Sequence, residues 1–198
     1  MEILIANNAG FCFGVKRAVK LAEKTLNENK NNEKVYSYGE LIHNPQVVQK
    51  FDKKGLKIIN DYEKEDKGTI VLRSHGIHPI IKEKMINLGH KCIDCTCPVL
   101  LNIYRKIEKK VKDGYEIIII GDENHPEIKA MVGYCGDKYC VINTKEEAEM
   151  IKNKKNLYII SQTTNLVEKF FQFSDIIKDR NENVIIENTI CDATSKRQ

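Results

Sequence analysis

The chain has 198 residues, which is enough for one large domain or two small ones. Its 41% hydrophobic and 30% charged residues are typical of a soluble globular protein, and a net charge of +4 gives little support for a nucleic-acid-binding protein. The sequence predicts neither a secretory signal nor a membrane span, because no basic region precedes the first apolar residues and the longest apolar run is only Ile117 to Ile120. We therefore expect a cytoplasmic protein, whose seven cysteines are free thiols or metal ligands rather than disulfides.

Strand and helix patterns alternate along the chain, which predicts an α/β fold with largely parallel sheets. In chain order, the first half is expected to contain strand 2–7, helix 14–26, strand 34–39, helix 44–55, strand 69–76, helix 79–89 and strand 91–95. The second half is expected to contain helix 98–114, strand 115–121, helix 126–135, strand 139–143, helix 144–155, strand 156–164, helix 165–180 and strand 183–191. Prolines near the helix starts and glycines after the helix ends support several of these boundaries.

An internal repeat organises these elements into units. The segments YGELIHNPQ (38–46) and IGDENHPEI (120–128) share a strand end, a Gly-acid-x-x-His sequence and a proline that opens a helix. Each unit begins with a cysteine before a long helix, Cys12 or Cys97, and this opening recurs at Cys191. We predict a first α/β unit over 1–96, a second over 97–190 and the start of a truncated third over 191–198. The alternative is two α/β halves that resemble each other only through their common topology.

The repeat predicts where the cysteines meet. In parallel α/β units, the loops at the carboxyl ends of the strands carry the ligands. Three similar units around an approximate threefold axis, in a trefoil-like assembly, would bring Cys12, Cys97 and Cys191 together at a central metal site. The histidines at other strand ends would surround the same centre, namely His43, His75 and His125.

Three thiolates in a cytoplasmic protein suit an iron–sulfur cluster. A [4Fe–4S] cluster with three protein ligands leaves one iron open, where a substrate oxygen can bind. A zinc site is the alternative, because Cys92 and Cys95 form one C-x₂-C pair, although no convincing second pair accompanies it.

The residues expected around this centre suit an anionic substrate. The three histidines and several helix N-termini can bind a diphosphate, Glu127 can relay a proton, and Thr163 and Thr164 supply hydroxyls. His78 and His90 are expected to be structural, because they fall on or at the end of a helix.

Seven motifs support a specific family. They are NNAGFCFGVKRAV around Cys12, LIHN around His43, RSHG around His75, DCTCP ending near Cys97, HPE at His125–Glu127, SQTT at 161–164 and ICDATSKRQ from Cys191. Together they resemble the 4-hydroxy-3-methylbut-2-enyl diphosphate reductases, the LytB or IspH family, in the order and separation of the motifs. The resemblance extends from one end of the chain to the other.

The resemblance implies the last step of the non-mevalonate isoprenoid pathway. An iron–sulfur reductase there converts (E)-4-hydroxy-3-methylbut-2-enyl diphosphate to isopentenyl and dimethylallyl diphosphate with two electrons and two protons. The implied cofactor is a [4Fe–4S] cluster held by Cys12, Cys97 and Cys191, with the substrate hydroxyl on its open iron. The implied electron donor is a ferredoxin or flavodoxin, and neither nucleic acid nor membrane is an expected partner.

The resemblance also implies roles for the other residues. The residues implied to bind the substrate are His43, His75, His125, Thr163 and Thr164. Glu127 is implied to supply protons, with assistance from Thr163. The family has a further domain with a Ser-x-Asn motif and a later serine, and this chain ends before them. We therefore expect the 198 residues to be a fragment that is inactive alone.

Cys92 and Cys95 are expected to be spare thiols beside Cys97. Two other functions stay open at this point. One is a non-catalytic fold in which a metal only joins the units. The other is a phosphate-binding or phosphotransfer domain that uses the histidines, although the chain lacks a Gly-rich phosphate loop.

Overall fold

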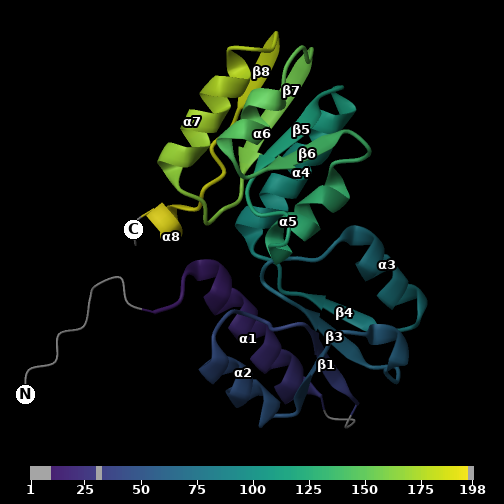
Figure 1. Ribbon diagram of the computed structural model, residues 1–198. Helices are drawn as coiled ribbons and strands as arrows, with labels where there is room; N and C mark the ends of the chain where they lie inside the picture. The colour runs from purple at the N-terminus through teal and green to yellow at the C-terminus, as the bar shows by residue number, and fades with distance from the viewer. Residues whose placement is uncertain (1–9, 30–32, 196–198) are drawn as a thin grey trace, which may run out of the picture.

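The computed structural model describes residues 10–29 and 33–195 and contains two parallel four-stranded sheets, one in each lobe of the molecule (Figure 1). The α/β class with parallel sheets, predicted from the sequence, is thereby confirmed. The strand expected at 2–7 lies outside the described residues. Within the described ranges, no helix is both long and apolar enough to cross a membrane.

The first sheet has the strand order β2-β1-β3-β4. Its strands are β1 (Val35–Tyr38), β2 (Leu56–Ile59), β3 (Thr69–Leu72) and β4 (Lys91–Asp94). One face packs against α1 (Phe13–Glu28) and α2 (Pro45–Asp52), and the other against α3 (Pro79–Asn87) and the 3-10 turn η1 (Tyr62–Lys64). Because both faces are covered, the strands are apolar on both sides.

The second sheet repeats this arrangement with the order β6-β5-β7-β8. Its strands are β5 (Glu116–Ile120), β6 (Tyr139–Ile142), β7 (Asn156–Ser161) and β8 (Asn183–Ile186). One face packs against α4 (Pro98–Lys112), α5 (Pro126–Met131) and η2 (Val132–Tyr134), and the other against α6 (Lys145–Met150) and α7 (Val167–Lys178). The equivalent strand orders support the internal repeat, while the unit boundaries at 96/97 and 190/191 stay predictions.

The isoleucine run of β5 explains how one strand serves two cores. Ile117 and Ile119 are buried in the core beneath α4 and α5, and Ile118 and Ile120 in the core beneath α6 and α7. Successive side chains of a strand point to opposite faces, so an unbroken apolar run fits a strand with helices on both sides.

The helix starts follow the polar and proline signals in the sequence. Asn44 caps α2 by accepting a hydrogen bond from the amide of Val47, and Pro45 occupies the first turn. Thr144 begins α6 with a capping box, in which its side chain and that of Glu147 each accept from the backbone of the other.

Several predicted boundaries were wrong. The strand β2 was missed, and α6 ends at Met150 rather than at residue 155, because Ile151 takes an extended conformation. The helix expected over 126–135 becomes a 3-10 turn after Met131. The strand expected over 183–191 ends at Ile186, since the Thr189 hydroxyl pairs there with the backbone of Ser161.

Candidate active site

The candidate site lies where loops from both sheets meet, at the carboxyl ends of the parallel strands. The site residues follow the ends of six strands: His43 follows β1, His75 follows β3, Cys97 follows β4, His125 and Glu127 follow β5, and Thr163 and Thr164 follow β7. The sixth, β8, is followed by Cys191. This is the edge at which parallel α/β folds bind ligands, and it holds a cavity of about 360 Å³.

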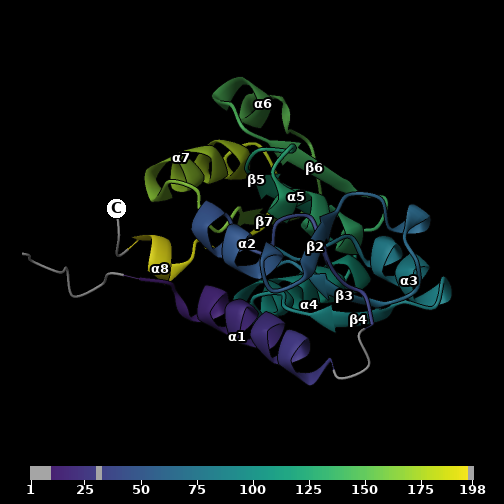
Figure 2. The ribbon, with the colours of Figure 1, turned by 90° about the horizontal axis from the view of Figure 1, so that it is seen from below.

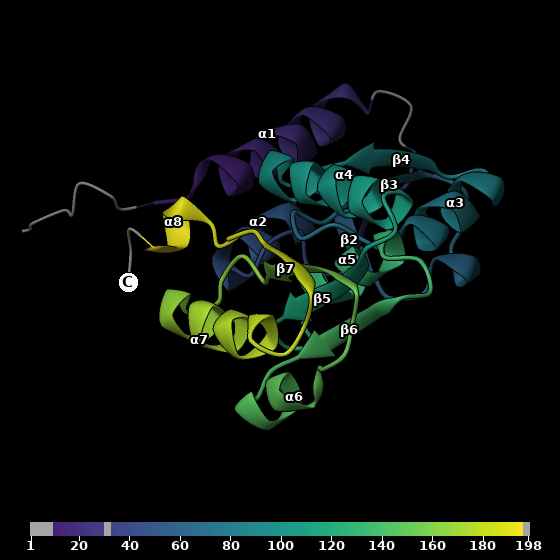
Figure 3. The same ribbon diagram turned by 90° about the horizontal axis from the view of Figure 1, so that it is seen from above.

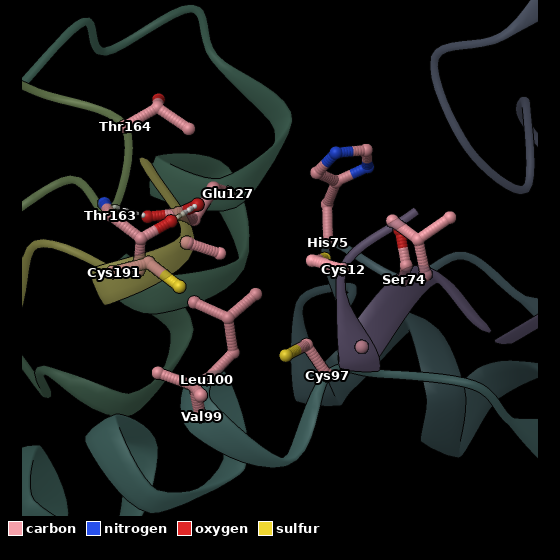
Figure 4. A pocket seen from close by; sticks show the side chains of 13 residues that line it. Cys12, Ser74, His75, Cys97, Val99, Leu100, Glu127, Thr163, Thr164 and Cys191 are labelled. Atoms are coloured by element: carbon pink, nitrogen blue, oxygen red, sulfur yellow. Dashed lines mark hydrogen bonds between the residues drawn. The ribbon is translucent and has the colours of Figure 1, made fainter. Parts of the chain in front are cut away.

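Three cysteines that are far apart in the sequence line this cavity (Figure 4). Cys12 is the N-cap of α1, Cys97 is the N-cap of α4, and Cys191 directly precedes the short helix α8 (Asp192–Ser195). The starts of α1 and α8 lie side by side when the molecule is viewed from below (Figure 2) and from above (Figure 3). The structure therefore brings together the three cysteines that the repeat singles out.

Backbone hydrogen bonds fix the positions of two of these cysteines. The amide of Cys97 donates to the carbonyl of Ser74 at 2.9 Å, and the amide of Cys191 donates to the carbonyl of Thr163 at 2.9 Å. Each cysteine is thus tied to a loop that follows a different strand. The loop before α4 is also held by Arg17 of α1, whose guanidinium donates to the carbonyl of Thr96 at 3.0 Å.

Gly14 leaves room for a sulfur atom beside the helix α1. A Cβ atom at this position would lie 2.5 Å from Sγ of Cys97. Burial raises the pKa of the Cys97 thiol, and the amides of Val99 and Leu100 at the start of α4 oppose that rise. A metal bound to this sulfur would also favour the thiolate form of Cys97, because the metal replaces the thiol proton.

The cysteine arrangement fits a cluster better than a single ion. Within residues 10–29 and 33–195, no group of three or more His, Cys, Asp or Glu side chains is placed to hold one metal ion. Zinc needs its ligands around a single point, whereas each thiolate of an iron–sulfur cluster binds a different iron. Cys12, Cys97 and Cys191 line one cavity from different elements, so each thiolate could bind a different iron.

Cys92 and Cys95 do not line the cavity. Cys95 is completely buried beneath α1 and α2, and burial raises its pKa to about 12. Cys92 packs against the core on the other face of the first sheet. Both therefore behave as small apolar residues in the structure.

Glu127 and Thr163 form a buried pair at the cavity wall (Figure 4). The Thr163 hydroxyl and amide each donate to a different carboxylate oxygen of Glu127, both at 2.6 Å. Glu127 is only 2% exposed, and this burial raises its pKa, while the two hydrogen bonds from Thr163 oppose the rise. A carboxyl group with a raised pKa can carry a proton into the cavity.

Three histidines form a cluster beside this pair. The ring centroids of His43 and His75 are 4.4 Å apart, and the ring of His125 lies 6.4 Å from His43 and 6.1 Å from His75. His75 lines the cavity, while His43 and His125 pack next to it. Burial, with the nearby His43 and His125, lowers the pKa of His75 to about 4, so its ring is neutral at physiological pH.

Thr164 lies at the exposed end of the cavity and accepts a hydrogen bond from the Gln162 side chain at 2.8 Å. The sequence indicated the Thr163 and Thr164 hydroxyls but not their different settings. Thr163 is buried against Glu127, whereas Thr164 is exposed.

Tyr104 is a residue that sequence reasoning missed. Its hydroxyl donates to the carbonyl of His75 at 3.1 Å, and its ring stacks on that of Tyr134 with centroids 4.4 Å apart. Gly76 makes room for this contact, because a Cβ atom there would lie 2.4 Å from the Tyr104 hydroxyl. In the sequence Tyr104 is one of several apolar residues on a helix face, a pattern that predicts only core packing.

Comparisons with known proteins show the family of the chain. A family model described as LytB protein matches residues 3–198. A protein of Caldanaerobacter subterraneus named 4-hydroxy-3-methylbut-2-enyl diphosphate reductase is 43% identical over all of this chain and 69% of its own length. A protein of the same name from Clostridioides difficile is 38% identical over all of this chain and 71% of its own length.

Solved structures show the same fold. One, described as (E)-4-hydroxy-3-methyl-but-2-enyl diphosphate reductase, the terminal enzyme of the non-mevalonate pathway, is 40% identical with a TM-score of 0.87. The alignment covers 99% of this chain and 70% of that one. Another, described as the E-1-hydroxy-2-methyl-but-2-enyl-4-diphosphate reductase from Plasmodium falciparum, is 28% identical with a TM-score of 0.88, over 96% of this chain and 61% of that one. The chain belongs to the LytB protein family.

Proposed function

We propose that this chain is a 4-hydroxy-3-methylbut-2-enyl diphosphate reductase that uses an iron–sulfur cluster. The reaction breaks the C–O bond of the allylic hydroxyl, consumes two electrons and two protons, and yields water with isopentenyl or dimethylallyl diphosphate. The observation that carries the proposal is that Cys12, Cys97 and Cys191 line one cavity together with His75 and Glu127.

Cys12, Cys97 and Cys191 would hold a [4Fe–4S] cluster. When bound, such a cluster supplies the electrons for C–O cleavage and an open iron for the substrate hydroxyl. Gly14 supports this role of Cys97, because the missing Cβ leaves the space that the Cys97 sulfur occupies at the cavity. A one-electron donor such as ferredoxin or flavodoxin, and a cytoplasmic location, stay predictions.

Glu127 is the proposed proton source. Its carboxyl lines the cavity and burial raises its pKa, which favours the protonated form that can donate. The Thr163 hydroxyl fixes the carboxyl in one orientation and offers a path for the proton between the two side chains.

The proposed diphosphate site is the histidine cluster. His75 is partly buried and neutral, and its buried Nδ1 atom has no hydrogen-bond partner among the described residues. An unpartnered buried polar atom is costly unless a ligand completes it. Oxygen atoms of a diphosphate can accept hydrogen bonds from His75 and from the adjacent His43 and His125, with Thr164 near the opening.

The test measures turnover after anaerobic reconstitution with iron and sulfide. Because the chain spans about 70% of the length of its relatives, we would assay it alone and extended by the remaining part of the Caldanaerobacter protein. The assay supplies a chemical one-electron reductant with the allylic diphosphate and quantifies both isoprenoid products.

Glu127→Gln should keep the cluster and lower the rate about a hundredfold or more, the usual contribution of a positioned acid. Glu123→Gln is the matched control, because Glu123 is an exposed acid in the same loop and does not line the cavity. A fully reconstituted, extended chain that consumes no substrate would contradict the proposal. Equal rates for wild type and Glu127→Gln would contradict the proton role alone.

A further inference from the structure

A second cavity lies between the two lobes, where α3 meets α5 and η2. Its volume is about 530 Å³, within the range typical of small-molecule sites, and it shares no lining residue with the cysteine cavity. The two lobes are in close contact here, since a Cβ atom at Gly133 would lie 2.4 Å from Cδ of Pro79 and 2.8 Å from Cδ2 of His78. The cavity is therefore bounded by elements of both units.

Each polar side chain in this second cavity can donate a hydrogen bond. These side chains are Tyr38, Arg73, His78 and Lys129, and no carboxylate lines the cavity. The amide of Ile80 donates to Nδ1 of His78 at 3.3 Å, so Nε2 is the ring nitrogen left to donate to a ligand. In the part of the chain that the structure describes, neither Arg73 nor Lys129 forms an ion pair, and the Tyr38 hydroxyl has no hydrogen-bond partner.

The Arg73 side chain is held in place before any ligand arrives. Its Nε atom donates to the carbonyl of Gly76 at 3.2 Å, and its guanidinium lies 5.9 Å from the centroid of the Tyr38 ring. The guanidinium is partly desolvated, which lowers its pKa from the ordinary value. A half-buried cation without a carboxylate partner favours an anion, and a fixed guanidinium suits phosphate oxygens because it donates in a planar fork.

The rest of the cavity wall is apolar. Ile80, Ile81, Ala130 and Val132 complete the lining, and the Ile80 side chain is 54% exposed. Binding an apolar group here would remove exposed hydrocarbon from water. The donors and this wall together favour a molecule that is anionic at one end and apolar at the other.

We propose that this second cavity binds a small organic phosphate or diphosphate with a short apolar part. The phosphate end would lie against Arg73, Lys129 and His78, and the apolar end against Ile80, Ile81 and Val132. The site does not depend on the reaction proposed above, because it uses none of the residues that line the cysteine cavity. It nevertheless adjoins the first site, because Arg73 lines the second cavity and the next two residues, Ser74 and His75, line the first.

The test uses the five histidines of the chain as reporters. Histidine labelled with ¹³C at Cε1 gives one NMR signal per ring, and single substitutions such as His78→Gln assign the signals. His78 reports on the second cavity, whereas His43, His75 and His125 report on the first site. His90 is only 5% exposed and its ring packs against that of Tyr36, so its signal serves as the internal reference.

Isopentenyl diphosphate, inorganic diphosphate and the neutral alcohol 3-methylbut-3-en-1-ol are titrated separately. We expect isopentenyl diphosphate to shift the His78 signal saturably and to bind more tightly than either other probe. Lys129→Gln should weaken this binding about tenfold, because a hydrogen bond to a charged group contributes at least that factor. Lys152→Gln, an exposed lysine outside the cavity, is the matched control and should leave the affinity unchanged.

Three results would overturn parts or all of the proposal. If the three diphosphate-site signals shift and His78 does not, the ligand binds only in the first site. If Lys129→Gln and Lys152→Gln weaken binding equally, the attraction is general charge rather than a site. If inorganic diphosphate binds as tightly as its isopentenyl ester, the apolar wall has no role and the proposed ligand class is wrong.

Discussion

Replacing Thr163 with valine should show how strongly the buried carboxyl of Glu127 depends on its partner. Valine keeps the shape of threonine but removes the hydroxyl that donates to Glu127 at 2.6 Å. Because Glu127 is only 2% exposed, a water molecule cannot take the place of the lost hydrogen-bond donor. A hydrogen bond of this kind contributes about 1–3 kcal/mol, so we expect Thr163→Val to lower the free energy of unfolding by about that amount.

The loss of unfolding free energy in Thr163→Val should depend on pH. Burial raises the pKa of Glu127 above its unfolded value of 4.5, so its contribution to stability is complete below pH 4.5 and declines as the pH rises through the folded value. Removing a donor to the ionised carboxylate raises the pKa of Glu127 further. The difference in unfolding free energy between wild type and variant should therefore be smallest below pH 4.5 and largest above the folded pKa.

Urea unfolding followed by circular dichroism, repeated across this pH range, measures the difference directly. Thr164→Val is the matched control, because Thr164 is exposed and its hydroxyl accepts a hydrogen bond from Gln162 rather than donating one to Glu127. An unfolding free energy that is unchanged in Thr163→Val, or reduced equally at every pH, would refute the coupling between this hydroxyl and the Glu127 carboxyl.

Three further predictions concern the first site. Tyr104→Phe keeps the ring stacked on Tyr134 and loses the hydrogen bond to His75, so urea unfolding should show a loss of about 1 kcal/mol; an unchanged value would contradict it. Gly14→Ala should keep the helix signal in circular dichroism but lower the iron bound after reconstitution, because its Cβ displaces the sulfur of Cys97; full iron content would refute this. Since the pKa of His75 is lowered to about 4, unfolding free energy should fall as the pH drops from 6.5 towards 4, by at most about 3 kcal/mol. His75→Gln should flatten that fall, and an unchanged slope would exclude His75 as its source.

The parallel fold was predictable where the sequence pattern reflects burial directly. The four isoleucines of β5 show it, because consecutive apolar residues are needed only when both faces of a strand are covered. The strand β2 was not predictable in the same way. Its four residues have no distinct period, and their buried ends, Leu56 and Ile59, make sense only once the strand pairs with β1.

The candidate site, too, was predictable from the sequence only in part. The repeat and the quoted motifs identified Cys12, Cys97 and Cys191, because each comes directly before a helix. The contact between Tyr104 and the loop after β3 joins residues 29 apart and arises only from the packing of α4 against it. The second cavity depends likewise on how the two lobes meet, so Lys129 carried no signal in the sequence.

The most direct test of the account is the iron and sulfide content of single cysteine-to-serine variants after anaerobic reconstitution, with visible absorbance and electron paramagnetic resonance spectra. The account predicts that Cys12→Ser, Cys97→Ser and Cys191→Ser lose or destabilise a four-iron cluster. The matched variants Cys92→Ser and Cys95→Ser should retain it, because these residues do not line the cavity. A cluster that survives Cys97→Ser and is lost in Cys95→Ser would contradict the ligand assignment on which the proposed reaction depends.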